Sequence, residues 1–157
     1  MAADRGGLEV GAGRITVERA DVTTLDADAV VNAANAQLAG GGGVDGAIHR
    51  AAGARELQEE LHRRYPQGCP TGAAVITSGH RMRAAHIIHA VGPRWSASRA
   101  EECDAQLRSA YRSALALAAA EGCATVATPS ISTGIYGFPV ERAAPIALAA
   151  ARAITML

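Results

Sequence analysis

The chain contains no lysine, although its 157 residues include fifteen basic and fifteen acidic side chains. Every basic residue is an arginine, so mechanisms that depend on a lysine amine, such as Schiff-base formation, are excluded. The formal net charge is zero and the two signs are interspersed, so no long-range field draws nucleic acid or an anionic membrane to the surface. A bound anion therefore has to be held by local groups.

Aromatic residues and cysteines are also scarce. One Trp, one Phe and three Tyr leave a core that must be aliphatic and rich in alanine. The three cysteines, Cys69, Cys103 and Cys123, form no CxxC pair and follow no signal-peptide pattern, which predicts a reduced, cytoplasmic setting. No apolar run approaches the roughly 20 residues that span a bilayer, so we expect no membrane partner.

The length fits one domain. Residues 1–13 are rich in glycine and show little pattern, which predicts a flexible N-terminal lead before a domain at 14–157. Within the domain, apolar runs and helical periodicity alternate along the chain. The pattern predicts strands at 15–17, 29–33, 73–77, 86–91 and 125–130, and helices at 44–65 with a break at Gly53, at 97–121 and at 139–153.

This alternation indicates an α/β sandwich with a mostly parallel sheet. Such sheets bind ligands in a crevice at the carboxyl ends of their strands. Two glycine-rich loops, 32–46 and 130–138, fall at that edge by this interpretation. We therefore expect the functional site to lie between them.

Four successive glycines, Gly40–Gly43, connect a buried strand to a helix start. Glycines allow the backbone to press its N–H groups against an anion, and the helix N-terminus adds its positive dipole end. The run predicts a phosphate cradle, against the simpler alternative of a mobile surface loop. The second loop, Ser130–Pro139, offers hydroxyls, glycines and another helix start. Two such loops at one edge suggest a diphosphate, although an ordinary turn with a packed aromatic residue also fits the second loop taken alone.

Three further features bear on the kind of site. A GxGxxG pattern at Gly41, Gly43 and Gly46 suggests a Rossmann-type dinucleotide site, but the glycines begin too far after the strand. Asp21 is placed either to accept a hydrogen bond from an amine such as that of adenine or to cap a helix. The five histidines show no metal-ligand spacing, and His86 and His89 lie on a strand where structural roles are more common. We expect no metal and no cofactor.

Five segments together resemble the MacroD-like branch of the macrodomain family, in order and in spacing, over nearly the whole chain. They are Asp21-Val22-Thr23, Asn32-Ala33-Ala34-Asn35, Gly40–Gly43 with Val44-Asp45-Gly46-Ala47-Ile48-His49, His89-Ala90-Val91-Gly92-Pro93, and Ser132-Thr133-Gly134-Ile135-Tyr136-Gly137. The resemblance implies a three-layer α/β/α sandwich with a mixed, mostly parallel sheet that holds ADP-ribose across its carboxyl edge.

The resemblance also implies the residues that contact this ligand. Asp21 and Val22 would meet the adenine, and Asn32 and Asn35 would hold ribose hydroxyls. The remaining contacts are with the diphosphate and the distal ribose, over which Tyr136 would close. They would come from Gly42, Gly43, Val44, Ser132, Thr133, Gly134, Ile135 and Tyr136.

The activity implied is hydrolysis of an ester on the distal ribose, in O-acetyl-ADP-ribose or in a protein mono-ADP-ribosylated on Asp or Glu. Asp45, assisted by Asn35, would polarise the water or orient the sugar, and either its carboxylate or the substrate's own phosphate would take the proton. His49 would support the loop. The alternatives are a non-catalytic ADP-ribose-binding module and, more remotely, a Rossmann-type nucleotide enzyme. Members of this family continue past the last helix into another strand. Because this chain ends at Leu157, either that C-terminal strand is missing or the arrangement differs.

Overall fold

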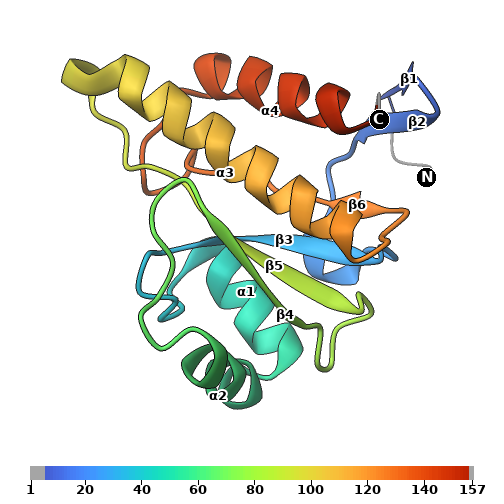
Figure 1. Cartoon of the computed structure of the whole chain (residues 1–157), viewed down its shortest axis with the longest axis vertical. Coiled ribbons are helices and arrows are strands. Elements are labelled where there is room, and N and C mark those ends of the chain that lie inside the picture. The colour runs from blue at the N-terminus through green and yellow to red at the C-terminus, as the bar shows by residue number, and fades with distance from the viewer. Residues whose placement is uncertain (1–5, 156–157) are drawn as a thin grey trace.

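A computed structural model of the chain describes residues 6–155. Its central sheet contains β3 (Ala29–Ala34), β4 (Ala74–Ser78), β5 (His86–Val91) and β6 (Val126–Ala127), in the order β4-β5-β3-β6 (Figure 1). β5 and β6 run parallel to β3, whereas β4 runs antiparallel to β5. The sheet is therefore mixed and mostly parallel, as the resemblance implied.

Helices cover both faces of this sheet (Figure 1). α1 (Gly43–Ala52) and α2 (Ala54–Arg64) pack on one face, while α3 (Ala100–Ala120) and α4 (Val140–Thr155) pack on the other. Successive residues of a strand point to opposite faces, so Val31 and Ile88 join the α3/α4 core while Val30 and Ile87 join the α1/α2 core. This alternation produces the three layers. The predicted break at Gly53 is confirmed, with a φ of 98° between the two helices.

The N-terminal region, predicted to be a flexible lead, contains regular structure. β1 (Gly6–Val10) and β2 (Gly13–Val17) form a separate antiparallel hairpin, with Leu8 opposite Ile15 (Figure 1). The glycine-rich turn between the strands allows this pairing, because Gly11 has a φ of 56°. Residues 6–13 thus belong to a paired hairpin, the flexibility of the lead stays a prediction, and residues 1–5 lie outside the described part of the chain.

The predicted strand at 125–130 is present only as Val126–Ala127. Pro129 has no N–H to donate to a ladder, which ends regular pairing there. The last helix is longer than expected and reaches Thr155, the final described residue. The expectation of a missing C-terminal strand stays a prediction.

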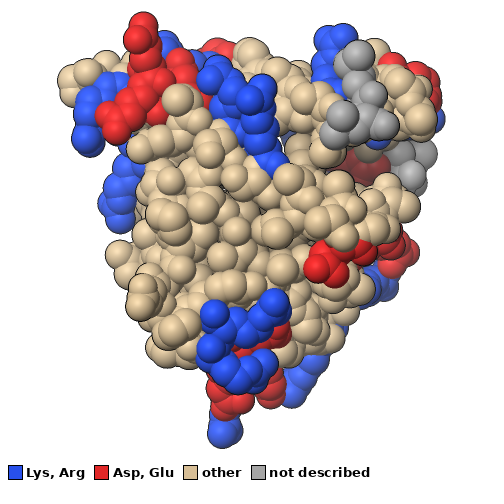
Figure 2. Space-filling model, in the orientation of Figure 1, with Lys and Arg blue, Asp and Glu red and all other residues tan. Residues whose placement is uncertain are grey.

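The surface agrees with the balanced composition. Figure 2 shows basic and acidic side chains beside one another at the two ends of one face, with a largely uncharged middle. Within residues 6–155, no helix combines the length and the apolar character needed to cross a membrane.

Candidate ligand-binding and catalytic site

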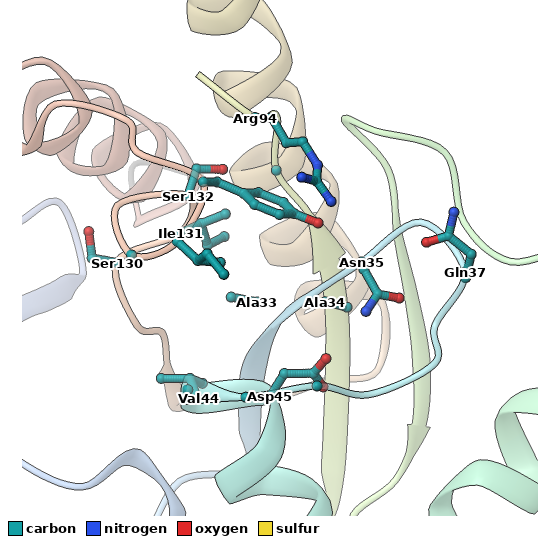
Figure 3. A pocket seen from close by; sticks show the side chains of 17 residues that line it. Ala33, Ala34, Asn35, Gln37, Val44, Asp45, Arg94, Ser130, Ile131 and Ser132 are labelled. Carbon is teal, nitrogen blue, oxygen red and sulfur yellow. The ribbon is translucent and has the colours of Figure 1, made fainter. Parts of the chain in front are cut away.

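A cavity of about 380 Å³ opens where β3 and β5 end (Figure 3). Three segments form its wall: the first loop (residues 35–43) with the start of α1, the second loop (residues 130–138), and the turn after β5. The lining residues are Ala33, Ala34, Asn35, Gln37, Gly41, Gly42, Gly43, Val44, Asp45, Gly92, Arg94, Ser130, Ile131, Ser132, Gly134, Ile135 and Tyr136. The two loops that the sequence placed at one edge thus face each other.

The first loop has a backbone that favours glycine. Gly40 and Gly43 have φ values of 77° and 59°, and a Cβ on Gly46 would lie 2.5 Å from the carbonyl oxygen of Gly41. The side chain of Asn35 closes the loop: its Nδ2 donates to the Gly40 carbonyl at 2.9 Å, and its Oδ1 accepts from the Ala39 N–H at 3.0 Å. α1 begins at the cavity wall, so its N-terminal dipole and free N–H groups favour an anion there.

Asp45 lies in the first turn of α1 and lines the cavity, although only 7% of the residue is exposed. Its Oδ1 accepts a hydrogen bond from Asn32 Nδ2 at 2.9 Å and lies 3.0 Å from His49 Nδ1. Its Oδ2 is the oxygen nearer to Gly41 in the cavity wall, 3.9 Å from the position that a Cβ on Gly41 would take. One carboxylate oxygen is therefore held by the protein while the other is available to a ligand or water.

Asn32 is fully buried and does not line the cavity. Its amide donates to Asp45 and to His89 Nδ1, the latter at 3.1 Å, and it pairs with His89 across β3 and β5. In this structure Asn32 therefore holds the carboxylate of Asp45, and the ribose contact implied by the resemblance stays a prediction.

His89 extends this buried network. Because Asn32 donates to Nδ1, the ring proton is on Nε2, which donates to Thr77 Oγ1 at 3.0 Å. Thr77 in turn donates to the Ser78 carbonyl at 3.1 Å. Burial lowers the pKa of His89 to about 4, so the ring is neutral near pH 7. The expectation that His89 is structural agrees with this geometry.

The second loop is held mainly by aromatic residues and backbone. Tyr111 Oη accepts from the Ile131 N–H at 2.8 Å and donates to the Pro129 carbonyl at 3.3 Å. Burial raises the pKa of Tyr111, so the hydroxyl keeps its proton. The ring of Phe138 is buried and lies 4.8 Å from that of Trp95. These contacts fix both ends of the loop.

Ser132 lies on the cavity side of this loop. It has a φ of 67°, and its Oγ is buried without a hydrogen-bond partner among residues 6–155. Buried hydroxyls are normally paired, so this oxygen is an unsatisfied donor beside the cavity that Ser132 lines. Ile135, which is fully exposed, completes the outer rim.

Some predicted contacts lie outside the cavity. Asp21 caps a 3-10 helix at Val22–Thr24, where its carboxylate accepts from Thr23 N and Thr23 Oγ1 at 2.9 and 2.7 Å. These hydrogen bonds lower the pKa of Asp21. Val22 packs against the α1/α2 core, and Thr133 donates to Ser130 Oγ at 2.7 Å. The proposed adenine contact of Asp21 and Val22 stays a prediction.

Arg94 was not singled out from the sequence. Its guanidinium lies 4.9 Å from the centre of the Tyr136 ring, and both residues line the cavity (Figure 3 for Arg94). The Trp95 N–H donates to the Tyr136 carbonyl at 2.8 Å, which joins this turn to the second loop. A signal was present, because Arg94 follows Gly92-Pro93 at the end of a strand that was expected to reach the same edge.

The Macro domain family matches residues 31–147. This chain belongs to that family. One relative of this macro domain is O-acetyl-ADP-ribose deacetylase 1 of Pantoea vagans, which is 55% identical over 136 residues, covering 86% of this chain and 79% of the relative. The resemblance seen in the sequence is confirmed, and the Rossmann interpretation of Gly41, Gly43 and Gly46 is wrong.

Solved structures agree on the fold of the macro domain. The Oceanobacillus iheyensis macrodomain with ADP superposes with a TM-score of 0.91 at 36% identity, over 99% of this chain and 84% of that one. A Trypanosoma brucei macrodomain in complex with ADP-ribose gives a TM-score of 0.77 at 42% identity, over 87% of this chain and 55% of that one. The α/β macrodomain fold is thus shown.

Proposed function

We propose that this macro domain binds ADP-ribose in the cavity and hydrolyses an ester on the distal ribose. The observation that carries the proposal is the carboxylate of Asp45, with Oδ1 held by Asn32 and His49 and Oδ2 nearer to Gly41 in the cavity wall. A binding module needs no such fixed acid beside the sugar. The activity therefore separates this proposal from a non-catalytic reader of ADP-ribose.

Binding rests on the two loops. The diphosphate lies between the N-terminus of α1 at Gly42 and Gly43 and the second loop, where Ser132 Oγ and the backbone near Gly134 offer donors. Val44 and Tyr136 enclose the distal ribose, and Asp21 and Val22 meet the adenine beyond the cavity. The volume of about 380 Å³ is within the range of small-molecule sites. The related macrodomain structures with ADP and with ADP-ribose support this choice of ligand.

In the reaction, Asp45 accepts a proton from a water molecule as the water oxygen bonds to the ester carbonyl carbon. The bond from that carbon to the ribose oxygen then breaks, and the ribose oxygen takes the proton from Asp45, which returns to its carboxylate form. Asn35, which also lines the cavity, holds the first loop and the sugar in place. Positioned proton transfer of this kind contributes roughly 10²- to 10⁴-fold to a rate. The products are a free acid and ADP-ribose.

Two esters fit this chemistry: O-acetyl-ADP-ribose and a protein carrying mono-ADP-ribose on Asp or Glu. The name of the Pantoea vagans relative supports the first. The test is to incubate the protein with each substrate side by side and to measure released ADP-ribose by mass spectrometry, together with calorimetric titration by ADP-ribose and by NAD. We expect turnover and a preference for ADP-ribose. Binding without turnover of either ester would favour a non-catalytic ADP-ribose-binding module, and a preference for NAD would overturn the ligand assignment.

A further inference from the structure

Gln58 of α2 makes two contacts that the proposed reaction does not use. Its half-buried side chain lies between α1 and the first loop, with Nε2 2.9 Å from the Leu38 carbonyl oxygen and 2.8 Å from His49 Nε2. His49 belongs to α1 and Gln58 to α2, and these two helices are neighbours on the same face of the sheet (Figure 1). A glutamine amide therefore contacts the histidine that itself contacts Asp45.

The Leu38 carbonyl fixes the orientation of this amide. A carbonyl oxygen only accepts, so the atom facing it must be the NH₂ group of Gln58 rather than Oε1. The same nitrogen has a second hydrogen, which points to His49 Nε2. A ring nitrogen that accepts a hydrogen bond has no proton. His49 is consequently unprotonated at Nε2.

The ring proton of a neutral His49 is then on Nδ1. That atom lies 2.9 Å from the Asp45 backbone carbonyl and 3.0 Å from Asp45 Oδ1, two acceptors on the preceding helical turn. His49 does not line the cavity, so its contact with the reaction runs through Asp45. Gln58, His49 and Asp45 form one directed series of hydrogen bonds from α2 to the cavity wall.

Protonation of His49 is opposed at one end and favoured at the other. The hydrogen bond to Asp45 raises the pKa of His49, whereas an N–H donated to Nε2 is compatible only with the neutral ring. His89 on β5, whose charge would interact with that of His49, is neutral, and Glu60 on α2 is paired with Arg64 and His80. Among residues 6–155, the hydrogen bond of His49 Nε2 is the one to Gln58.

We propose that Gln58 is a positioning residue that keeps His49 neutral with its proton on Nδ1, and so keeps Asp45 Oδ1 bound while Oδ2 faces the substrate. An imidazolium at this position would place a full positive charge against the carboxylate and weaken it as a proton acceptor. The link to hydrolysis rests on the proposed function, whereas the protonation state of His49 does not.

The first test is nitrogen NMR of the histidine rings near pH 7. The expected spectrum of the unmodified protein has His49 protonated on Nδ1 and His89 protonated on Nε2, so the two buried rings give opposite patterns. Gln58→Glu should convert His49 to the imidazolium, and Gln58→Met, which removes both hydrogen bonds without adding charge, should raise its pKa by a smaller amount. Gln67→Glu adds the same charge at an exposed site and should leave His49 unchanged.

The unmodified protein alone can overturn the proposal, whether or not the variants fold: His49 found as an imidazolium, or protonated on Nε2, contradicts it. An unchanged His49 signal in a folded Gln58→Glu variant contradicts it as well. The His89 signal reports that the fold is intact.

The second test is the pH dependence of ester hydrolysis. Gln58→Glu should slow turnover by about tenfold near pH 7 and recover as the pH rises, because His49 then loses its extra proton. Binding of ADP-ribose should change little. If no variant and no wild-type sample hydrolyses an ester, the proposed function fails, and the NMR result still decides the role of Gln58. A flat ratio of variant to wild-type rates across pH would show that Gln58 is merely structural.

Discussion

The two loops that face each other across the cavity are held by different kinds of interaction. The first loop and the start of α1 are fixed by hydrogen bonds among polar side chains, from Asn35 to the loop backbone and from Asn32 and His49 to Asp45. The second loop is fixed by the Tyr111 hydroxyl, the buried ring of Phe138 and backbone contacts. Hydrogen bonds that include a carboxylate and a histidine anchor the first side, whereas backbone hydrogen bonds, the Tyr111 hydroxyl and apolar packing anchor the second.

This difference separates two tasks. A reacting carboxylate must be held in one orientation and one charge state, which hydrogen bonds from defined donors provide. A loop that grips a phosphate and a sugar needs a fixed backbone, which apolar packing provides without titrating. We therefore expect substitutions at the first loop to alter turnover and its pH dependence, and substitutions at the second loop to alter the affinity for ADP-ribose.

Replacement of Asp45 should have the largest effect. Asp45→Ala is expected to lower turnover of O-acetyl-ADP-ribose by roughly 10²- to 10⁴-fold, while ADP-ribose affinity stays within about tenfold, since binding rests on the backbone of both loops. Steady-state kinetics and calorimetry measure the two quantities. Asp26→Ala, at an exposed acid outside the cavity, is the control and should alter neither. Undiminished turnover in Asp45→Ala would contradict the proposed catalytic role of Asp45.

Acid should lower the free energy of unfolding through His89. The pKa of His89 in the fold is about 4, below the ordinary value of 6.5, so the unfolded state binds more protons between these values. The stability that the neutral His89 ring gives the fold is fully present above pH 6.5 and declines as the pH falls toward 4. The total loss in the free energy of unfolding is about 3 kcal/mol. His49 acts in the opposite direction, because its pKa is raised.

Urea unfolding measured from pH 7 to pH 4 checks this prediction. His89→Gln is the matched variant, because an amide occupies the same place without titrating. It should be less stable at pH 7 and should lose less stability on acidification than the wild type. Equal slopes in the two proteins would assign the acid sensitivity to other groups, such as Glu60, whose pKa is lowered by Arg64 and other hydrogen-bond partners despite its burial.

Alanine at Gly46 should displace the first loop, and alanine at Gly92 should displace the second. A Cβ on Gly46 would lie 2.5 Å from the Gly41 carbonyl oxygen, and a Cβ on Gly92 would lie 2.2 Å from Ser132 Oγ. Gly46→Ala should lower kcat by about tenfold, and Gly92→Ala should weaken ADP-ribose binding by about tenfold, since small displacements are costly in a fitted site. Gln67→Ala, at an exposed residue outside the cavity, serves as control. Identical kinetic effects of the first two variants would contradict the division of tasks.

Most of the fold was predictable because hydrophobic periodicity reports which faces are buried. The two helices on either side of Gly53 and the buried strands at 29–33 and 86–91 were identified in this way. The hairpin at 6–17 was not, because its pairing depends on the register between two short glycine-containing segments rather than on either one. The strand at 125–130 was overestimated because Pro129 ends the pairing early.

The cavity-lining loops were predictable for a similar local reason: each glycine-containing loop lies between a buried strand and a helix start, where backbone N–H groups can bind an anion. The role of Asn32 was not, because β3 is buried on both faces and the sequence does not show which neighbour a polar residue meets. Its partner follows from the parallel register that places Asn32 opposite His89. The contact of Gln58 with His49 likewise depends on how α2 packs against α1.

The smallest predicted effect concerns Ile135 on the second loop. Its side chain is fully exposed and lines the cavity, so it contributes little to folding but can cover a bound ligand. Ile135→Ala should leave the melting temperature unchanged and weaken ADP-ribose binding by about fivefold, the equivalent of roughly 1 kcal/mol of apolar burial. Val140→Ala, 58% exposed and outside the cavity, should change neither quantity. Calorimetry with both variants shows whether the Ile135 side chain contributes to affinity. An affinity unaffected by Ile135→Ala would mean that the second loop holds its ligand through backbone and Ser132 alone.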